Sequence, residues 1–231
     1  MSIQDFDRPS LTDVAYKEIR NGILLGELEP GDKLVVNDLV DKWRISNTPI
    51  KEALNRLVAE GLVEALPRRG MRVRLLMAKE LREYFEIRTL YEVHCCRKAV
   101  ERIDDNLPVL EELQVTLEKC HDILDDEFNY LMQFQLDEMF HMLIAGLCGN
   151  DTLVKDFDRI HAHILMIGVY ANRHAPLRRL PETFAEHSAI LERLERRDAD
   201  GMAEAMRIHL ANTAEGLQKL YNPASGRFMC K

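Results

Sequence analysis

Four ionisable side chains lie where helical packing requires apolar residues. Asp137 and His141 are four residues apart, so on a helix they share one face. His187 and His209 occupy similar positions in two later segments. The stripes that these residues interrupt consist mainly of apolar side chains at helical spacing: Phe134, Ile144 and Cys148; Leu180, Phe184, Leu191 and Leu194; and Met202, Met206, Thr213, Leu217 and Leu220. Three helices therefore each place an ionisable group on an inward face.

A buried carboxylate or imidazole destabilises a fold unless it has a partner. One divalent metal would satisfy all these groups if it were bound by Asp137, His141, His187 and His209. Zinc, nickel and manganese all accept such ligands. Two alternatives remain: core polar groups that are each satisfied separately, or a simple Asp137–His141 ion pair. His161 and His163 are two residues apart and would point in different directions on a helix, so we expect neither in this site.

The segments that carry these residues read as a helical bundle. After Leu75 no segment shows a convincing alternating strand pattern. Breaks that contain Pro, Gly, Asn or Asp separate six periodic stretches at about 79–103, 107–126, 129–148, 150–173, 180–198 and 199–221. The pattern predicts a six-helix bundle that covers residues 79–221.

Residues 30–75 have a different organisation, typical of a winged helix-turn-helix. Two short helical patterns flank a break at 46–49, whose sequence is SNTP. Hydroxyl and amide side chains can cap a helix, and Pro is tolerated in its first turn, so we expect the second helix to begin near Pro49. Two strands, Leu62–Leu66 and Met71–Leu75, should follow around the turn at 67–70.

This element carries groups that suit DNA. Asn47, Lys51 and Asn55 are spaced four apart on the second helix, where amide and ammonium groups can meet base edges and phosphates. Arginines crowd the hairpin, as a wing along phosphates requires. The alternative is a surface helix pair with a solvated hairpin. The residues that we expect to contact DNA are Asn47, Thr48, Lys51, Asn55, Arg68, Arg69 and Gly70.

Composition sets limits on the rest. A chain of 231 residues with 46% hydrophobic and 30% charged residues suits two modest folded domains, expected at 1–75 and 79–221. The first 75 residues are electrically neutral, so the formal charge of −8 lies in the remainder and disfavours nucleic-acid binding there. No apolar stretch is long enough to span a bilayer and no signal peptide is evident, which predicts a cytoplasmic protein. The five cysteines read as reduced thiols.

The first segment resembles the DNA-binding domain of GntR-type bacterial transcription regulators. The resemblance rests on GELEPG at 26–31, SNTPIKEAL at 46–54, EGLV at 60–63 and RG at 69–70, and it covers about residues 10–75. Asn47 and Lys51 stand where the family usually has arginine. Because arginine makes bidentate contacts to guanine, these departures imply a different operator sequence.

Residues 79–221 are similar to the all-helical effector domain, called FCD, of the FadR branch of this family. The family's Asp-x-x-x-His, Gly-Asn break, later His and final His-Leu are matched by Asp137–His141, Gly149-Asn150, His187 and His209-Leu210. The resemblance implies a metal site with all four ligand positions filled. It also implies a pocket arginine, which Arg88 could supply. Arg88 could equally form a surface salt bridge with Glu92.

Together these features predict a mainly α protein and a metabolite-responsive repressor rather than an enzyme. The expected effector is a small organic acid, bound at the metal with help from Arg88, that changes the affinity of a homodimer for double-stranded operator DNA. One alternative is a metal-dependent enzyme in which the Asp/His site activates water. Against it, no separate general base stands out. A further alternative is a regulator with a purely structural metal, or one that binds a longer acyl ligand without metal.

Overall fold

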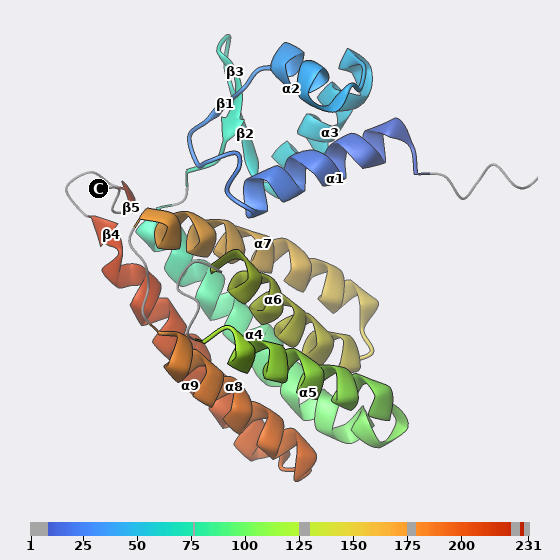
Figure 1. Ribbon diagram of the computed structural model, residues 1–231, viewed down its shortest axis with the longest axis vertical. Helices are drawn as coiled ribbons and strands as arrows, with labels where there is room; N and C mark the ends of the chain where they lie inside the picture. Colours follow the sequence, from blue (N-terminus) through green and yellow to red (C-terminus); the bar gives the residue numbers. More distant parts are fainter. Residues whose placement is uncertain (1–8, 76, 125–129, 175–178, 223–226, 229–231) are drawn as a thin grey trace, which may run out of the picture. The chain divides into compact units, whose positions relative to one another are not determined.

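The computed structural model describes residues 9–75, 77–124, 130–174, 179–222 and 227–228. It divides into two compact units, Met1–Leu75 and Leu76–Lys231, each of which is described by itself (Figure 1). Among the described residues, no helix is long and apolar enough to cross a membrane. The predicted class, a winged helix-turn-helix followed by a helical bundle, is confirmed.

The first unit packs three helices against a small sheet. Its elements are α1 (Leu11–Leu24), β1 (Lys33–Leu34), α2 (Val36–Trp43), α3 (Asn47–Glu60), β2 (Val63–Leu66) and β3 (Gly70–Val73). Ser10 starts α1 with a capping box, in which its hydroxyl accepts from the Asp13 amide and Asp13 accepts from the Ser10 amide. Helix α3 packs against α1 and α2, and it buries the predicted apolar face: Ile50, Leu54 and Leu57.

The strands form an antiparallel sheet in the order β1-β3-β2. Val63 pairs with Val73 and Leu66 with Gly70, so β2 and β3 form the predicted hairpin. Strand β1 was not predicted. It pairs Leu34 with Met71, and its two residues are too few to show an alternating pattern in the sequence.

Helix α3 begins two residues earlier than predicted. Ser46 is its N-cap and has an extended backbone, but its side chain makes no capping hydrogen bond, contrary to our expectation. Pro49 therefore lies inside the first turn rather than at its start. The amides of a first helical turn have no intrahelical acceptor, so the missing N–H of Pro49 leaves the helix intact.

The second unit contains the six predicted helices. They are α4 (Ala78–Arg102), α5 (Leu107–Asp122), α6 (Tyr130–Leu147), α7 (Asp151–His174), α8 (Leu180–Glu195) and α9 (Ala199–Lys219), with a short 3₁₀ turn, η2 (Ile103–Asp105), after α4. Helix α4 is central, since it packs against α6, α7, α8 and α9, while α5 packs against α6 and α8 (Figure 1).

This unit differs from the sequence prediction at the end of α8 and after α9. Helix α8 stops three residues early because Arg197 has a left-handed backbone, and Asp198 then caps α9 by accepting from the Gly201 amide. A short hairpin, β4 (Tyr221–Asn222) with β5 (Arg227–Phe228), follows α9 where no strand was expected. The predicted helix ends at 125–126 and 129 lie outside the described residues. The cysteines of the described residues are free thiols, and Cys230 lies outside them.

Candidate functional site

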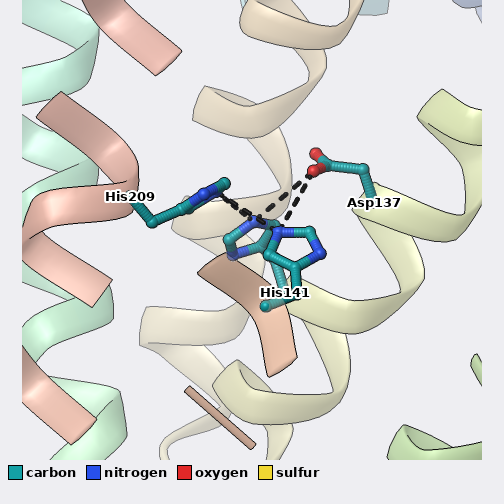
Figure 2. Close-up of side chains that lie close together, drawn as sticks. Asp137, His141 and His209 are labelled. Atoms are coloured by element: carbon teal, nitrogen blue, oxygen red, sulfur yellow. Dashed lines mark hydrogen bonds and ion pairs between the residues drawn. The ribbon is translucent and has the colours of Figure 1, made fainter. Parts of the chain in front are cut away.

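The structure brings the four predicted metal ligands together inside the bundle. Helix α6 contributes Asp137 and His141, α8 contributes His187 and α9 contributes His209, and one ligand atom from each lies within 4.8 Å of all the others. Figure 2 shows the labelled side chains pointing toward one another. The three imidazoles are almost fully buried, whereas the Asp137 side chain is 26% exposed.

The separations within this group suit a single metal ion. The Nε2 atom of His209 lies 3.2 Å from that of His141 and 3.3 Å from that of His187. Oδ1 of Asp137 lies 3.5 Å from Nε2 of His187 and 3.8 Å from Nε2 of His141. Ligands at roughly 2.0–2.1 Å from a tetrahedral metal lie about 3.3 Å apart. The four donor atoms therefore fit around a common centre.

Two glutamates orient the imidazoles. Glu92 on α4 accepts a hydrogen bond from Nδ1 of His141, and Glu186 on α8 accepts one from Nδ1 of His209 at 2.8 Å. A neutral imidazole carries only one N–H, so both Nε2 atoms present lone pairs. These lone pairs face each other across 3.2 Å, an arrangement that a bound cation would stabilise. Carboxylates that hold the outer nitrogen of a histidine are a regular feature of metal sites.

The electrostatics of the group also fit a cation. Burial, and then the charge of the nearby Arg88, lower the pKa of His141 well below its usual value. Burial likewise lowers the pKa of His187. The rings of His141 and His187 are therefore neutral near pH 7 and can donate a lone pair to a metal. Burial raises the pKa of Asp137. Although partial burial opposes it, hydrogen bonds from His209 and Asn212 lower the pKa of Glu186, which stays ionised as an acceptor.

Arg88 does pair with Glu92, but the pair is buried and is not the surface salt bridge of the alternative interpretation. Both side chains are 1% exposed, and the Nε atom of Arg88 donates to Oε1 of Glu92 while the other oxygen holds His141. Glu92 therefore connects Arg88 to a candidate metal ligand. The i,i+4 spacing of Arg88 and Glu92 predicts that they pair. The third partner, His141, lies on another helix and cannot be identified from this spacing.

His161 lies close to the group, contrary to our expectation. It is 2% exposed, and its Nε2 atom lies 4.0 Å from Oδ2 of Asp137. His163 points elsewhere and stacks on Tyr84, with ring centroids 4.7 Å apart. Two histidines at this spacing do point in different directions, as expected. Helical spacing separates the directions of the two side chains but does not determine which of them faces the site.

A cavity of about 110 Å³ adjoins the group. Its lining includes Asp137, His161 and two arginines, Arg88 and Arg179. Arg179 precedes α8 and donates to Glu186 at 2.9 Å, so each arginine is paired with one of the glutamates that orient the imidazoles. Neither Glu186 nor Arg179 was singled out in the sequence, because their partners lie on other helices or turns.

The candidate DNA-binding residues lie on the surface of the first unit. Asn47, Thr48, Lys51 and Asn55 are exposed on α3, on the side away from its buried face. The two acidic residues of α3 are held by α1: Glu52 accepts from Thr12 at 2.7 Å and Glu60 accepts from Tyr16 at 2.9 Å. Arg56 is likewise paired with Asp13 of α1 at 2.7 Å. The helix therefore directs its acidic groups toward α1.

The tip of the β2–β3 hairpin carries the remaining candidates. Arg68, Arg69 and Gly70 are exposed, whereas Arg72 is held by Glu64 at 2.6 Å, so the positive charge of the wing is concentrated at its tip. The Arg69 amide donates to the Leu66 carbonyl and closes a tight turn. Arg68 has φ of 60°, a conformation that costs roughly 1–2 kcal/mol for a residue with a side chain. Such strain often accompanies functional positions.

Comparisons with known proteins agree with this architecture. Residues 11–73 match the family described as bacterial regulatory proteins, gntR family, and residues 83–212 match the FCD domain. The Nta operon transcriptional regulator of Aminobacter aminovorans is 31% identical over 58% of this chain and 62% of its own length. The HTH-type transcriptional repressor GlaR of Escherichia coli is 27% identical over 84% of this chain and 90% of its own length.

A solved structure shares the fold. That of E. coli McbR/YncC superimposes with a TM-score of 0.81 at 23% identity and covers 93% of this chain and all of its own. The relatives are transcriptional regulators, so the alternative of a metal-dependent enzyme is not supported. The FCD match alone spans more than half of the chain. The chain therefore belongs to the gntR family of bacterial regulatory proteins, as a transcriptional regulator with an FCD domain.

Proposed function

We propose that this regulator is a repressor whose affinity for its operator depends on a small organic acid bound at a divalent metal in the bundle. One observation carries the proposal: the Nε2 lone pairs of His141 and His209 face each other at 3.2 Å, while their Nδ1 atoms are committed to glutamates. With both rings neutral, this arrangement is unfavourable unless a cation lies between the two lone pairs. With such a cation, it is a ligand set that the fold has preorganised.

The charge of the site selects an anion. Three neutral imidazoles and the Asp137 carboxylate around an ion of charge 2+ give a net charge of about +1. When bound, zinc, nickel or manganese would supply that charge and free coordination positions. Arg88 lines the adjoining cavity, and its Nη2 atom is buried without a hydrogen-bond partner among the described residues, so it would hold one carboxylate oxygen by a charge-assisted hydrogen bond.

The first unit would dock its α3 helix in a major groove. Asn47, Thr48, Lys51 and Asn55 would face base edges and phosphates, and Arg68, Arg69 and Gly70 at the wing tip would lie along the backbone or in a minor groove. One such helix reads few base pairs, so we expect a homodimer on paired half-sites of duplex DNA. Light scattering that shows a monomer both with and without DNA would contradict this.

Repression is supported by the relative GlaR, which is named as a repressor. The acid would then release the operator, and the coupling must be reciprocal: operator DNA shifts the affinity for acid by the factor by which acid shifts the affinity for DNA. A regulator whose metal is purely structural would show no such coupling at the metal.

Titration calorimetry tests the proposed site. Metal-loaded protein and chelator-treated protein are each titrated with a panel of mono-, di- and hydroxycarboxylates. We expect at least one acid to bind the loaded protein, to bind much more weakly after chelation, and to bind more weakly to Arg88→Ala with metal content unchanged. Binding that survives chelation unaltered, or no binding at all, would assign the metal a structural role and place the effector elsewhere.

A further inference from the structure

The cavity beside the four-residue group is large enough for a ligand. Its volume of about 110 Å³ is well above the roughly 10–15 Å³ that one water molecule needs. Asp137 belongs both to the four-residue group and to the lining of the cavity. A molecule in the cavity can therefore approach the metal ligands directly at Asp137.

The cavity is formed by the helical turns next to the candidate metal ligands. Gln133 lies one turn before Asp137 on α6, and Thr213 lies one turn after His209 on α9. Arg88 lines the same cavity from α4. Residues one turn apart share a helix face, so the donors of the cavity and the ligands of the metal form one continuous polar surface.

Three residues of this lining have buried polar atoms with no hydrogen-bond partner within the described part of the chain. These atoms are Nη2 of Arg88, Nε2 of Gln133 and Oγ1 of Thr213. Buried polar groups in folded proteins are nearly always satisfied. Each of the three can donate a hydrogen bond, so together they call for a ligand that offers oxygen acceptors at more than one place.

The charges around the cavity decide whether each donor suits a carboxylate oxygen or a neutral oxygen of the ligand. The positive charges of Arg88 and Arg179 are already balanced by Glu92 and Glu186. The net charge of about +1 expected at the loaded metal site is balanced by one carboxylate. Gln133 and Thr213 are uncharged donors, which suit a neutral oxygen. A second carboxylate at these positions would bring a negative charge into a partly enclosed space where the described lining residues offer no free cation to balance it.

Much of the remaining lining is apolar. Phe134, Ile164, Leu165 and Leu217 line the cavity. Such walls favour a short carbon chain between the two oxygen-bearing ends of a ligand, because burial of its CH₂ groups is favourable. They disfavour polyols and sugars, whose additional hydroxyls would lack partners there.

We infer that the effector is a short-chain monocarboxylate with a hydroxyl or keto oxygen, and that Gln133 and Thr213 recognise this neutral oxygen. The inference rests on the proposed function, which assigns the carboxylate to the metal and Arg88. It adds a specificity element: Gln133 and Thr213 distinguish a substituted acid from a plain one.

Calorimetry with matched acids tests the assignment on metal-loaded full-length protein. The ligands are butanoate, 2-hydroxybutanoate, 3-hydroxybutanoate, 2-oxobutanoate and butanedioate, which share four carbons and differ in the second polar group. At least one hydroxy or keto acid should bind about tenfold or more tightly than butanoate, as expected for one additional satisfied hydrogen bond in a buried site. Butanedioate should bind more weakly than that acid.

Near-isosteric variants identify the donors. Gln133→Met and Thr213→Val remove a donor with little change in volume, and each should reduce the preference for the substituted acid while leaving the affinity for butanoate within about twofold. Thr183→Val is the matched control, because Thr183 lines the same cavity but its hydroxyl is not one of the three unpartnered atoms. It should keep the preference of the wild type.

The possible failures are distinguishable. If no acid binds the loaded wild type, the proposed function fails and this inference fails with it. If acids bind but butanoate equals its hydroxy and keto derivatives, or butanedioate binds most tightly, the inference alone is overturned. It is also overturned if the Gln133 and Thr213 variants retain the full preference of the wild type.

Discussion

Replacing Glu186 by Gln should weaken metal binding without unfolding the protein. Oε2 of Glu186 accepts from Nδ1 of His209 at 2.8 Å, and its other oxygen accepts from Asn212 and Arg179. Glutamine can still accept a hydrogen bond, but its neutral carbonyl makes the imidazole a weaker donor to a cation. Loss of such an outer partner typically costs 10- to 100-fold in metal affinity.

That range corresponds to about 1.4–2.7 kcal/mol of binding free energy. The effect on folding should be smaller, because Arg179 is 26% exposed and solvent screens its ion pair. We expect the free energy of unfolding of the metal-free variant to fall by about 1 kcal/mol or less. This variant therefore separates the effect on metal affinity from the effect on the free energy of unfolding. It is more informative than a variant that lacks one of the metal-ligating side chains.

The assay is competition with a chromophoric chelator at pH 7.5, performed with zinc, nickel and manganese in turn. Glu182→Gln is the matched control: it makes the same change in charge on the same helix, one turn away at an exposed position. The control should bind metal as the wild type does. If Glu186→Gln binds every metal as tightly as the control, the role assigned to the carboxylate–His209 hydrogen bond is refuted.

Three further predictions concern DNA binding and stability. Replacing Lys51 and Arg69 by Ala together should weaken binding to a duplex selected from a random pool and flatten its salt dependence; an unchanged affinity and salt slope in fluorescence anisotropy would refute the docking. Arg68→Gly should relieve the left-handed backbone and shift stability by at most about 1 kcal/mol, in the stabilising direction, while DNA affinity falls; thermal melts and anisotropy check both signs. In metal-free protein, the lowered pKa of His187 means that the unfolded chain binds its proton first, so the free energy of unfolding should fall as pH drops below about 6.5. Urea titrations from pH 7.5 to 5.5 should show a steeper fall in wild type than in His187→Phe.

Much of the fold follows from local pattern. The six bundle helices were predictable because Pro, Gly, Asn or Asp residues mark their boundaries, and apolar residues recur at helical spacing between them. The strands β1 and β4 were missed since two residues cannot show alternation. The start of α3 was misplaced because Pro49 is tolerated anywhere in a first turn.

The juxtaposition of the four candidate ligands was predictable for the same reason. Each interrupts an inward apolar stripe, and inward faces of neighbouring helices must meet. Several residues around them were not predictable. Glu186 reaches His209 across a helix–helix contact, and His161 reaches Asp137 in the same way. Such contacts depend on the relative rotation of two helices, which no single-helix pattern determines.

Operator binding under four conditions tests the central claim most directly. Fluorescence anisotropy is measured on a selected duplex with metal-loaded or chelated protein, each with and without the acid that binds most tightly in calorimetry. We predict that the acid weakens operator binding at least fivefold in the loaded protein, near the lower end of typical allosteric coupling, and has no effect in the chelated protein. An equal effect of the acid with and without metal, or no effect in either, would contradict the account.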